Sequence, residues 1–228
     1  VNAIDVDAPG TSSLTPAVAP PVYMSFSQNR ARVPGIAGWV TPHDVVKFQT
    51  TVAAPGYSYE VFFDGADVGL TTVSERIDSL TVWTPDEYAT TSPSVPADCT
   101  AGLLFISTAG NYRVAGPTGA QLVGKANDIL VFCATNLGPN TAGFWYKGFD
   151  GAAAGIAPRA LRNISVHEAS FAASATGPWD MTFSFSSPVP FAVGPFQGMP
   201  DTVYLYETGE GIEGELRDLN YDFPTLNG

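Results

Sequence analysis

Acidic residues that recur in matching contexts are the first candidates for chemistry in this sequence. Asp64 lies in "YEVFFDGADVGL" (59–70), and a similar turn returns as "FWYKGFDGAAAGI" (144–156). Asp64 and the nearby Asp67 could coordinate a cation through carboxylate oxygens. The second turn carries Ala153 where the first has its second carboxylate, so a repeated metal site fails there. We favour a structural role, in which Asp accepts local backbone hydrogen bonds and Gly takes positive φ.

Further aspartates could also bind ligands. Asp44, Asp128 and Asp201 begin similar apolar segments and would lie on one rim if those segments stacked around an axis. There they could attract a cation or hold sugar hydroxyls, although we favour capping of the loop that enters each strand. Asp5 and Asp7 in "DVDAPGT" resemble the opening of a calcium loop without the later acidic ligands. We expect no cofactor, with Ca²⁺ as the alternative.

Aromatic residues in loop-like segments give a stronger indication of binding than the carboxylates do. An exposed indole or phenol on a rigid β scaffold can stack on a sugar ring or anchor a protein partner. The alternative, which we favour, is that these rings cover the ends of sheets. The candidates are Trp39, Tyr88, Tyr112 and Trp179. In addition, Asn163 in "NIS" satisfies the glycosylation sequon, within a segment that we expect to be a strand.

Cysteine and histidine offer little reactive chemistry. Cys99 precedes the segment "GLLFIS" and Cys133 ends "DILVFC", so antiparallel pairing of these two segments would bring the sulfurs together. We prefer a disulfide to two buried thiols. His43 and His167 are the only histidines, and no nucleophile elbow or zinc-binding helix motif accompanies them. A carboxylate pair for glycoside hydrolysis would leave no local spacing, so a hydrolase stays among the hypotheses.

The composition restricts the class of protein. The 228 residues include 22 acidic and 10 basic side chains, which gives a formal net charge of −12 and disfavours nucleic acid as a partner. No apolar run reaches the roughly 18 residues of a membrane helix, so membrane insertion is not expected. Abundant Gly, Pro and aromatic residues are typical of an extracellular all-β protein, secreted or at the cell surface. The first residues lack a secretion-signal layout, which indicates a mature chain or a part of a longer one.

The elements that must position these residues recur in a fixed order. Four kinds of short apolar segment follow one another, as in "SLTV", "LLFIST", "DILVFC" and "WYKGFD". We therefore predict a single all-β domain made of three diverged, four-stranded antiparallel repeats, packed propeller-like or prism-like. The predicted units are residues 1–70, 71–156 and 157–228. Alternation of apolar and polar residues, as in "VYMSFS" (22–27), favours strands, and helix should be scarce.

The same segments carry a resemblance to known proteins. The order of "DVVKFQ" (44–49), "YEVFFDGADVGLTT" (59–72) and "RIDSLTV" (76–82) resembles repeats of large secreted or surface proteins of bacteria, with units of the form "LYLSF…DIxxF…YFDGSDVGL…IDAL". The second unit repeats it in "NDILVFCATNLGPNTAGFWYKGFDG" (127–151). The chain is also similar, more generally, to β-propeller repeats of the NHL type. Neither resemblance implies catalytic residues.

Three functions are compatible with these observations. The first is a non-catalytic extracellular module, a structural or adhesive building block whose partners are other protein subunits or copies of itself. The second is a lectin-like protein that binds glycans through loop aromatics and aspartates. The third is a glycoside hydrolase with a carboxylate pair. We favour the first and expect no enzymatic activity.

Overall fold

Strands form almost all of the regular structure in this protein. The computed structural model describes residues 1, 3–6, 20–51, 56–86, 97–156, 159–169, 179–185, 191–193, 196–198, 203–207 and 211–216. Two short 3₁₀ helices are η1 (Ala66–Val68) and η2 (Val73–Glu75). None of the helices in this part of the chain has the length and apolarity needed to cross a membrane. The all-β class predicted from the sequence is confirmed.

The strands form three four-stranded antiparallel sheets and two small hairpins. Within each sheet the strands are neighbours in chain order. The first sheet contains β1 (Ala3–Val6), β2 (Val22–Ser25), β3 (Val45–Thr50) and β4 (Tyr57–Phe63). The second contains β5 (Ile77–Trp83), β6 (Gly102–Thr108), β9 (Ile129–Asn136) and β10 (Ala142–Phe149). The third contains β11 (Leu161–Ala169), β12 (Trp179–Phe185), β15 (Val203–Glu207) and β16 (Gly211–Leu216).

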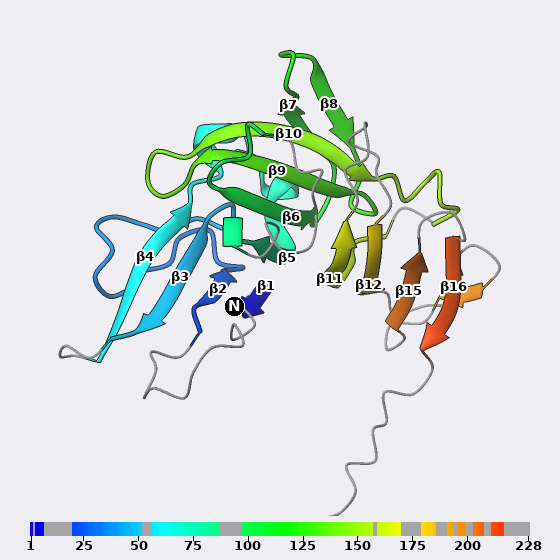
Figure 1. Ribbon diagram of the computed structural model, residues 1–228, viewed down its shortest axis with the longest axis horizontal. Helices are drawn as coiled ribbons and strands as arrows, with labels where there is room; N and C mark the ends of the chain where they lie inside the picture. The colour runs from blue at the N-terminus through cyan, green and yellow to red at the C-terminus, as the bar shows by residue number, and fades with distance from the viewer. Residues whose placement is uncertain are drawn as a thin grey trace, which may run out of the picture.

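Each hairpin is inserted between the second and third strands of a sheet. The hairpin of β7 (Tyr112–Ala115) and β8 (Gln121–Gly124) interrupts the second sheet, and that of β13 (Phe191–Val193) and β14 (Phe196–Gly198) interrupts the third. Figure 1 shows β7 and β8 standing out from the second sheet. In the first sheet the corresponding connection has no named strand in its described part, apart from an isolated bridge between Ala31 and Val40.

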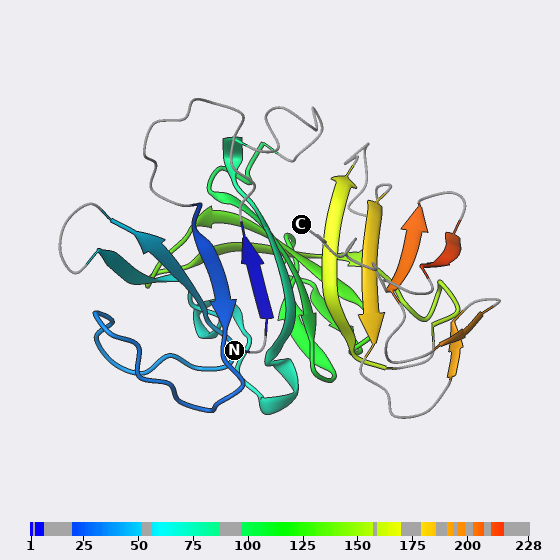
Figure 2. The same ribbon diagram turned by 90° about the horizontal axis from the view of Figure 1, so that it is seen from below.

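The three sheets are arranged in series, with the second between the other two (Figure 2). The first strands of successive sheets lie side by side, since β5 contacts both β1 and β11. The sequence predicted three repeats packed propeller-like or prism-like, and no closed barrel or propeller is found among the described residues. The physical reason is that the second sheet buries both faces, one against each neighbouring sheet, and this hides the apolar surfaces without closing a ring.

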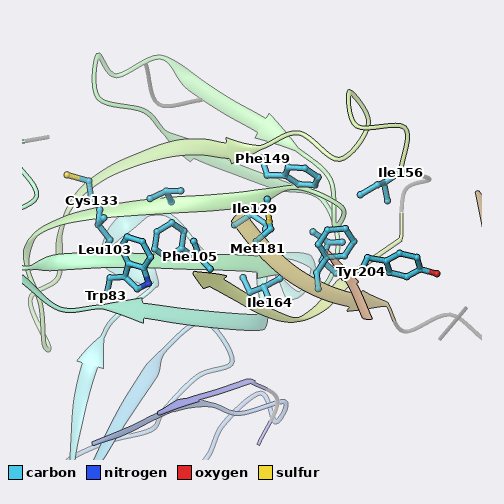
Figure 3. Close-up of a cluster of buried hydrophobic side chains, with 14 of the residues drawn as sticks. Trp83, Leu103, Phe105, Ile129, Cys133, Phe149, Ile156, Ile164, Met181 and Tyr204 are labelled. Atoms are coloured by element: carbon cyan, nitrogen blue, oxygen red, sulfur yellow. The ribbon is translucent and has the colours of Figure 1, made fainter. Parts of the chain in front are cut away.

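Two hydrophobic cores hold the sheets together. The core between the second and third sheets joins Phe105 and Ile129 to Met181 and Tyr204, as Figure 3 shows. The core between the first and second sheets includes Leu80, Leu104, Phe132 and Trp145 from the second sheet. Every residue of β5 and β6 is buried, which explains why these two strands lack clear alternation of apolar and polar residues.

A disulfide joins Cys99 and Cys133, with an S–S distance of 2.02 Å. Cys133 lies in β9, and Cys99 lies three residues before β6, its neighbour in the sheet. Both cysteines are buried at the core between the second and third sheets. The bond therefore ties the segment just before β6 to the neighbouring strand β9. Antiparallel pairing of these two segments was expected to bring the sulfurs together in this way.

Candidate functional site

The aspartates that precede β3 and β9 bind turns at the far end of the next strand. Asp44 Oδ1 accepts a hydrogen bond from the Gly65 amide at 3.2 Å, and Asp128 Oδ1 accepts one from the Gly151 amide at 3.1 Å. Each aspartate also caps its own loop: Asp44 Oδ2 accepts from the Thr41 amide at 2.7 Å. Both carboxylates are buried. They act as acceptors for backbone amides, which is the capping role that we favoured from the sequence.

The glycines of the two Phe-Asp-Gly turns are required by close backbone packing. A Cβ atom at Gly65 would collide with the carbonyl oxygen of His43, and a Cβ atom at Gly151 would collide with that of Asn127. These carbonyls belong to the residues just before Asp44 and Asp128. The two turns therefore approach the same neighbouring loop in the same way, and each needs glycine there for lack of space.

Further backbone hydrogen bonds occur in matching pairs in the first two sheets. The Gly65 carbonyl accepts from Leu70 at 2.8 Å, and the Gly151 carbonyl accepts from Ile156 at 2.7 Å. The loop before each of the two aspartates also binds the strand that begins the following sheet. The bonds are Ile77 N to Pro42 O at 3.0 Å and Leu161 N to Ala126 O at 3.1 Å.

A polar cleft of about 700 Å³ lies beside the second of these turns. It is bounded by the β7–β8 hairpin, the segment around η2 and the end of β10. Its lining brings together seven titratable side chains: Glu75, Tyr112, Arg113, Lys125, Asp128, Lys147 and Asp150. This cleft is the candidate functional site.

Lys147 on β10 connects two carboxylates in the cleft. Its Nζ atom lies 3.2 Å from Asp128 Oδ2 and 3.2 Å from Asp150 Oδ2. Burial disfavours the ammonium charge, but the hydrogen bonds and attraction from Asp150 and Asp128 outweigh it and raise the pKa of Lys147. The Ala153 amide, helped by Lys147, outweighs burial and lowers the pKa of Asp150. Lys147 and Asp150 are therefore each held in the charged form.

Tyr112 on β7 closes the inner end of this network. Its hydroxyl donates to Asp128 Oδ2 at 3.1 Å, and its side chain is buried. Burial and the negative charge of Asp128 raise the pKa of the Tyr112 hydroxyl. The expectation that Tyr112 is an exposed loop aromatic is wrong, because the chain folds back at this point as a hairpin over the cleft and buries the ring.

Glu75 at the end of η2 is a buried acceptor for the wall of the cleft. Its Oε2 atom accepts from the amides of Thr71 and Thr72, at 3.0 and 2.8 Å, and Oε1 accepts from the Arg113 amide at 2.9 Å. Burial opposes the charge, but these donors and the Thr72 hydroxyl outweigh it and lower the pKa of Glu75. Glu75 thus links η2 to the β7–β8 hairpin.

The cleft is poorly suited to acid–base hydrolysis. Asp128 and Asp150 are close enough to share one ammonium, but a general acid needs a raised pKa and the pKa of Asp150 is lowered. Asp128 already accepts hydrogen bonds from Gly151, Lys125 and Tyr112. The chemistry that the cleft offers is recognition of a polar ligand at its rim, where Lys125 and Arg113 are exposed.

The carboxylates proposed as cation ligands also take structural roles where the structure describes them. Asp5 Oδ2 accepts from the Val82 amide at 2.9 Å, and Asp67 Oδ2 accepts from the Thr141 amide at 3.0 Å. Asp64 Oδ1 accepts from the Ala66 amide at 3.0 Å. Burial, with the charges of Asp44 and Asp67, raises the pKa of Asp64. In the described ranges no three His, Cys, Asp or Glu side chains are placed to hold a metal ion.

The remaining predicted site residues do not gather at the cleft. Trp39 is a loop residue that is 50% exposed, and the Arg32 guanidinium carbon lies 4.2 Å from its ring centroid, so one face of the indole is covered. Trp179 begins β12, and its side chain lies outside the described residues. Tyr88, Asp201 and Asp7 also lie outside them.

Histidine and the glycosylation asparagine are accounted for locally. His43 is largely buried, and its Nε2 atom donates to the Thr72 carbonyl at 2.7 Å. His167 lies in β11, as expected for a strand residue, but its side chain is outside the described set. Asn163 is exposed in β11 with φ +49°, and its amide donates to the Ser184 hydroxyl at 2.9 Å.

Of the seven titratable residues of the cleft, sequence reasoning singled out Tyr112 and Asp128 and missed the other five, among them Glu75 and Lys147. A local signal existed for Glu75: Thr72 and Glu75 in "TVSE" have the spacing of a capping box, and both of its hydrogen bonds are present. Lys147 had only the weaker signal of an acidic partner three residues later, in "KGFD". Its contact with Asp128 depends on strand pairing, which local spacing does not reveal.

Comparison of the chain with protein-family models, with curated proteins and with solved structures gives no match.

Proposed function

We propose that this protein is a non-catalytic structural module of an extracellular or cell-surface assembly, built from three diverged four-stranded units stacked in series. The observation that carries the proposal is the matched pair of hydrogen bonds from Gly65 to Asp44 and from Gly151 to Asp128. In both sheets an aspartate just before the third strand accepts a hydrogen bond from the glycine of the Phe-Asp-Gly turn that follows the fourth strand. Such a correspondence is what divergence from a common repeat would produce.

The state of the acidic side chains supports the absence of catalysis. Asp44, Asp128 and Glu75 are buried, and each accepts several hydrogen bonds from backbone amides. A catalytic carboxylate needs an oxygen that is free to reach substrate. The Cys99–Cys133 disulfide supports an extracellular location.

A hydrolysis screen tests the non-catalytic assignment. The chain is incubated with a panel of chromogenic glycosides, and release of the chromophore is followed for the wild type, Asp150→Asn and Asp86→Asn. Asp150 is the partly exposed carboxylate of the cleft, whereas Asp86 is an exposed acid that does not line it. No turnover is expected from any of the three. Turnover that Asp150→Asn abolishes and Asp86→Asn preserves would overturn the proposal.

Saccharide binding in the cleft is a second candidate function. The observation that favours it is that exposed Lys125, Arg113 and Asn111 surround a polar floor formed by Lys147 and Asp150. Ligand sites combine a concave surface with a few convergent polar groups, and sugar hydroxyls match such donors and acceptors. Trp39, the exposed loop aromatic, does not line this cleft.

A glycan array tests the second candidate with matched lysine variants. Lys125→Ala removes an exposed cation from the rim, and Lys47→Ala removes a cation that instead pairs with Glu60 on the first sheet. If the cleft binds saccharides, Lys125→Ala weakens binding about tenfold and Lys47→Ala leaves it unchanged. Equal binding by both lysine variants, or loss of binding on Trp39→Ala alone, would show that the cleft is not the saccharide site.

A further inference from the structure

The second and third sheets each turn one face toward the preceding sheet, and the first strand of each shows this most clearly. Leu80 on β5 faces the first sheet and is 2% exposed, while Ile164 on β11 faces the second sheet and is 5% exposed. Strand pairing places Ile4 of β1 in the same position as Leu80, since Ile4 lies opposite Met24 and Leu80 lies opposite Ile106. Ile4 is 59% exposed.

The rest of this face of the first sheet is also apolar. We define the outer face by the described residues that share the Ile4 side of the pleat: Ile4, Val22, Met24, Val46, Phe48, Tyr57, Tyr59 and Val61, together with Thr50. Phe48, Tyr57 and Tyr59 contact one another, with ring centroids 5.1 to 6.3 Å apart. The outer face therefore has the composition of the buried faces of the other sheets.

Among the described residues, the loop that packs on the outer face covers its middle. Ala31, Val33 and Val40 pack on Val46, which is fully buried. The two ends stay open, because Ile4 is 59% and Tyr57 is 42% exposed. In the second sheet the matching connection projects as the β7–β8 hairpin (Figure 1), whose Tyr112 and Val114 join the core that the first sheet closes on that face.

At each junction, side chains on the first strand of the earlier sheet bind the backbone of the first strand of the later sheet. Asp5 Oδ2 on β1 accepts from the Val82 amide on β5 at 2.9 Å. Ser79 Oγ on β5 accepts from the Ile164 amide on β11 at 2.7 Å, and Thr81 Oγ1 donates to the Ile164 carbonyl at 3.0 Å. The direction is the same at both junctions, from the earlier sheet to the later one.

We infer that the outer face binds the third sheet of a second copy of this chain, head to tail, with β1 following β11 as β11 follows β5. Ile164 on β11 corresponds to Leu80 on β5, so the next residue, Ser165, corresponds to Thr81. Ser165 is partly exposed. In the pair of chains its hydroxyl donates to the Ile4 carbonyl of the next copy, and Ile4 becomes buried. The interface continues the two sheet junctions already within the chain. This inference rests on the proposed structural role.

A head-to-tail contact has a consequence for assembly. The two surfaces that meet are different, so each copy keeps one surface of each kind available after pairing. Such contacts produce a ring if the rotation between copies closes and an open filament if it does not. A building block of a larger assembly requires this property, whereas a face-to-face dimer would stop at two copies.

Solution mass tests whether the outer face associates. Light scattering over a range of concentrations is compared for the wild type, Ile4→Asp and Val123→Asp. Val123 is a matched control because it is a 54% exposed apolar residue on the β7–β8 hairpin, away from the outer face. The mass of the wild type and of Val123→Asp should rise with concentration, and Ile4→Asp should shift this rise to at least tenfold higher concentration. A wild type that stays monomeric, or equal association of Ile4→Asp, would overturn the inference.

Cysteine pairing tests the direction of the contact. The two native cysteines are joined to each other, so Ile4→Cys and Ser165→Cys each carry a single free thiol. Under mild oxidation a mixture of the two variants should give mixed dimers in several-fold excess over either homodimer, as read by mass spectrometry. A dominant Ile4→Cys homodimer would show face-to-face pairing and overturn the head-to-tail inference. Monomeric chains without enzymatic turnover would overturn this inference alone and leave the non-catalytic module in place.

Discussion

The Oδ1 atom of Asp44 accepts a hydrogen bond from the Gly65 amide at 3.2 Å, although the two residues are 21 positions apart. Asp128 makes the same bond to Gly151 at 3.1 Å, across 23 positions. Each bond ties the loop before the third strand of a sheet to the turn after the fourth. The recurring Phe-Asp-Gly turn is therefore held by an acid from another segment, and its own aspartate caps the turn locally.

Loss of either buried aspartate should destabilise the fold. Asp44→Asn and Asp128→Asn each replace an acceptor oxygen with a donor that faces backbone amides, which should lower the free energy of unfolding by about 1–3 kcal/mol. Asp128→Asn should cost more, because it also removes the ion pair with Lys147. Denaturant titration measures both, with exposed Asp86→Asn as the control. Unchanged midpoints in both variants would contradict this account of the turns.

Glycine at the two turns should be irreplaceable for reasons of space. Gly65→Ala and Gly151→Ala place a methyl group against the carbonyls of His43 and Asn127, so we expect losses of about 3 kcal/mol or more. Gly119→Ala is the matched control, since Gly119 has φ +75° but open space around its Cβ position. It should cost only the backbone strain, about 1 kcal/mol. Equal losses in thermal unfolding for all three would show that φ, and not crowding, decides.

Much of the fold could be predicted because the strand segments have strong local patterns. The segment "RIDSLTVW" was expected to be a strand and forms β5. The way the sheets pack could not be predicted, because a pattern of apolar residues does not say whether one face or two will be covered. The β7–β8 hairpin was missed for a related reason: "GNYRV" has the composition of a loop, and its burial depends on the distant Asp128.

The register between units was the least predictable feature. Aligning "VYMSFS" with "LLFIST" by their first residues would match Val22 with Leu103, but pairing with the first strand places Val22 in the position of Leu104. A one-residue error is easy in "LLFIST", where consecutive apolar residues remove the alternation that fixes the face. The spacing of Asp44 and Asp128 did identify two residues of matching role. Their partners came from tertiary structure.

Acid should weaken the wall of the cleft through Glu75. The pKa of Glu75 is lowered on folding, so its carboxylate stabilises the fold above its ordinary value of 4.5, and this contribution is lost as the pH falls through the lowered pKa. Glu75→Gln should cost about 2–3 kcal/mol at neutral pH. The difference in unfolding free energy between wild type and variant should shrink below pH 4.5. A difference that is constant from pH 7 to 3 would exclude a charge-dependent role.

Removal of the disulfide should cost a large part of the stability. The Cys99–Cys133 bond closes a segment of 34 residues, and restricting the unfolded chain over that length is worth about 3–4 kcal/mol. The double variant Cys99→Ala/Cys133→Ala should therefore unfold at a much lower denaturant concentration than the oxidised wild type. Reductant should bring the wild type close to the double variant and leave the variant itself unchanged. Identical midpoints with and without reductant would mean that the second sheet holds together without this bond, and that its two buried faces supply the stability of the module.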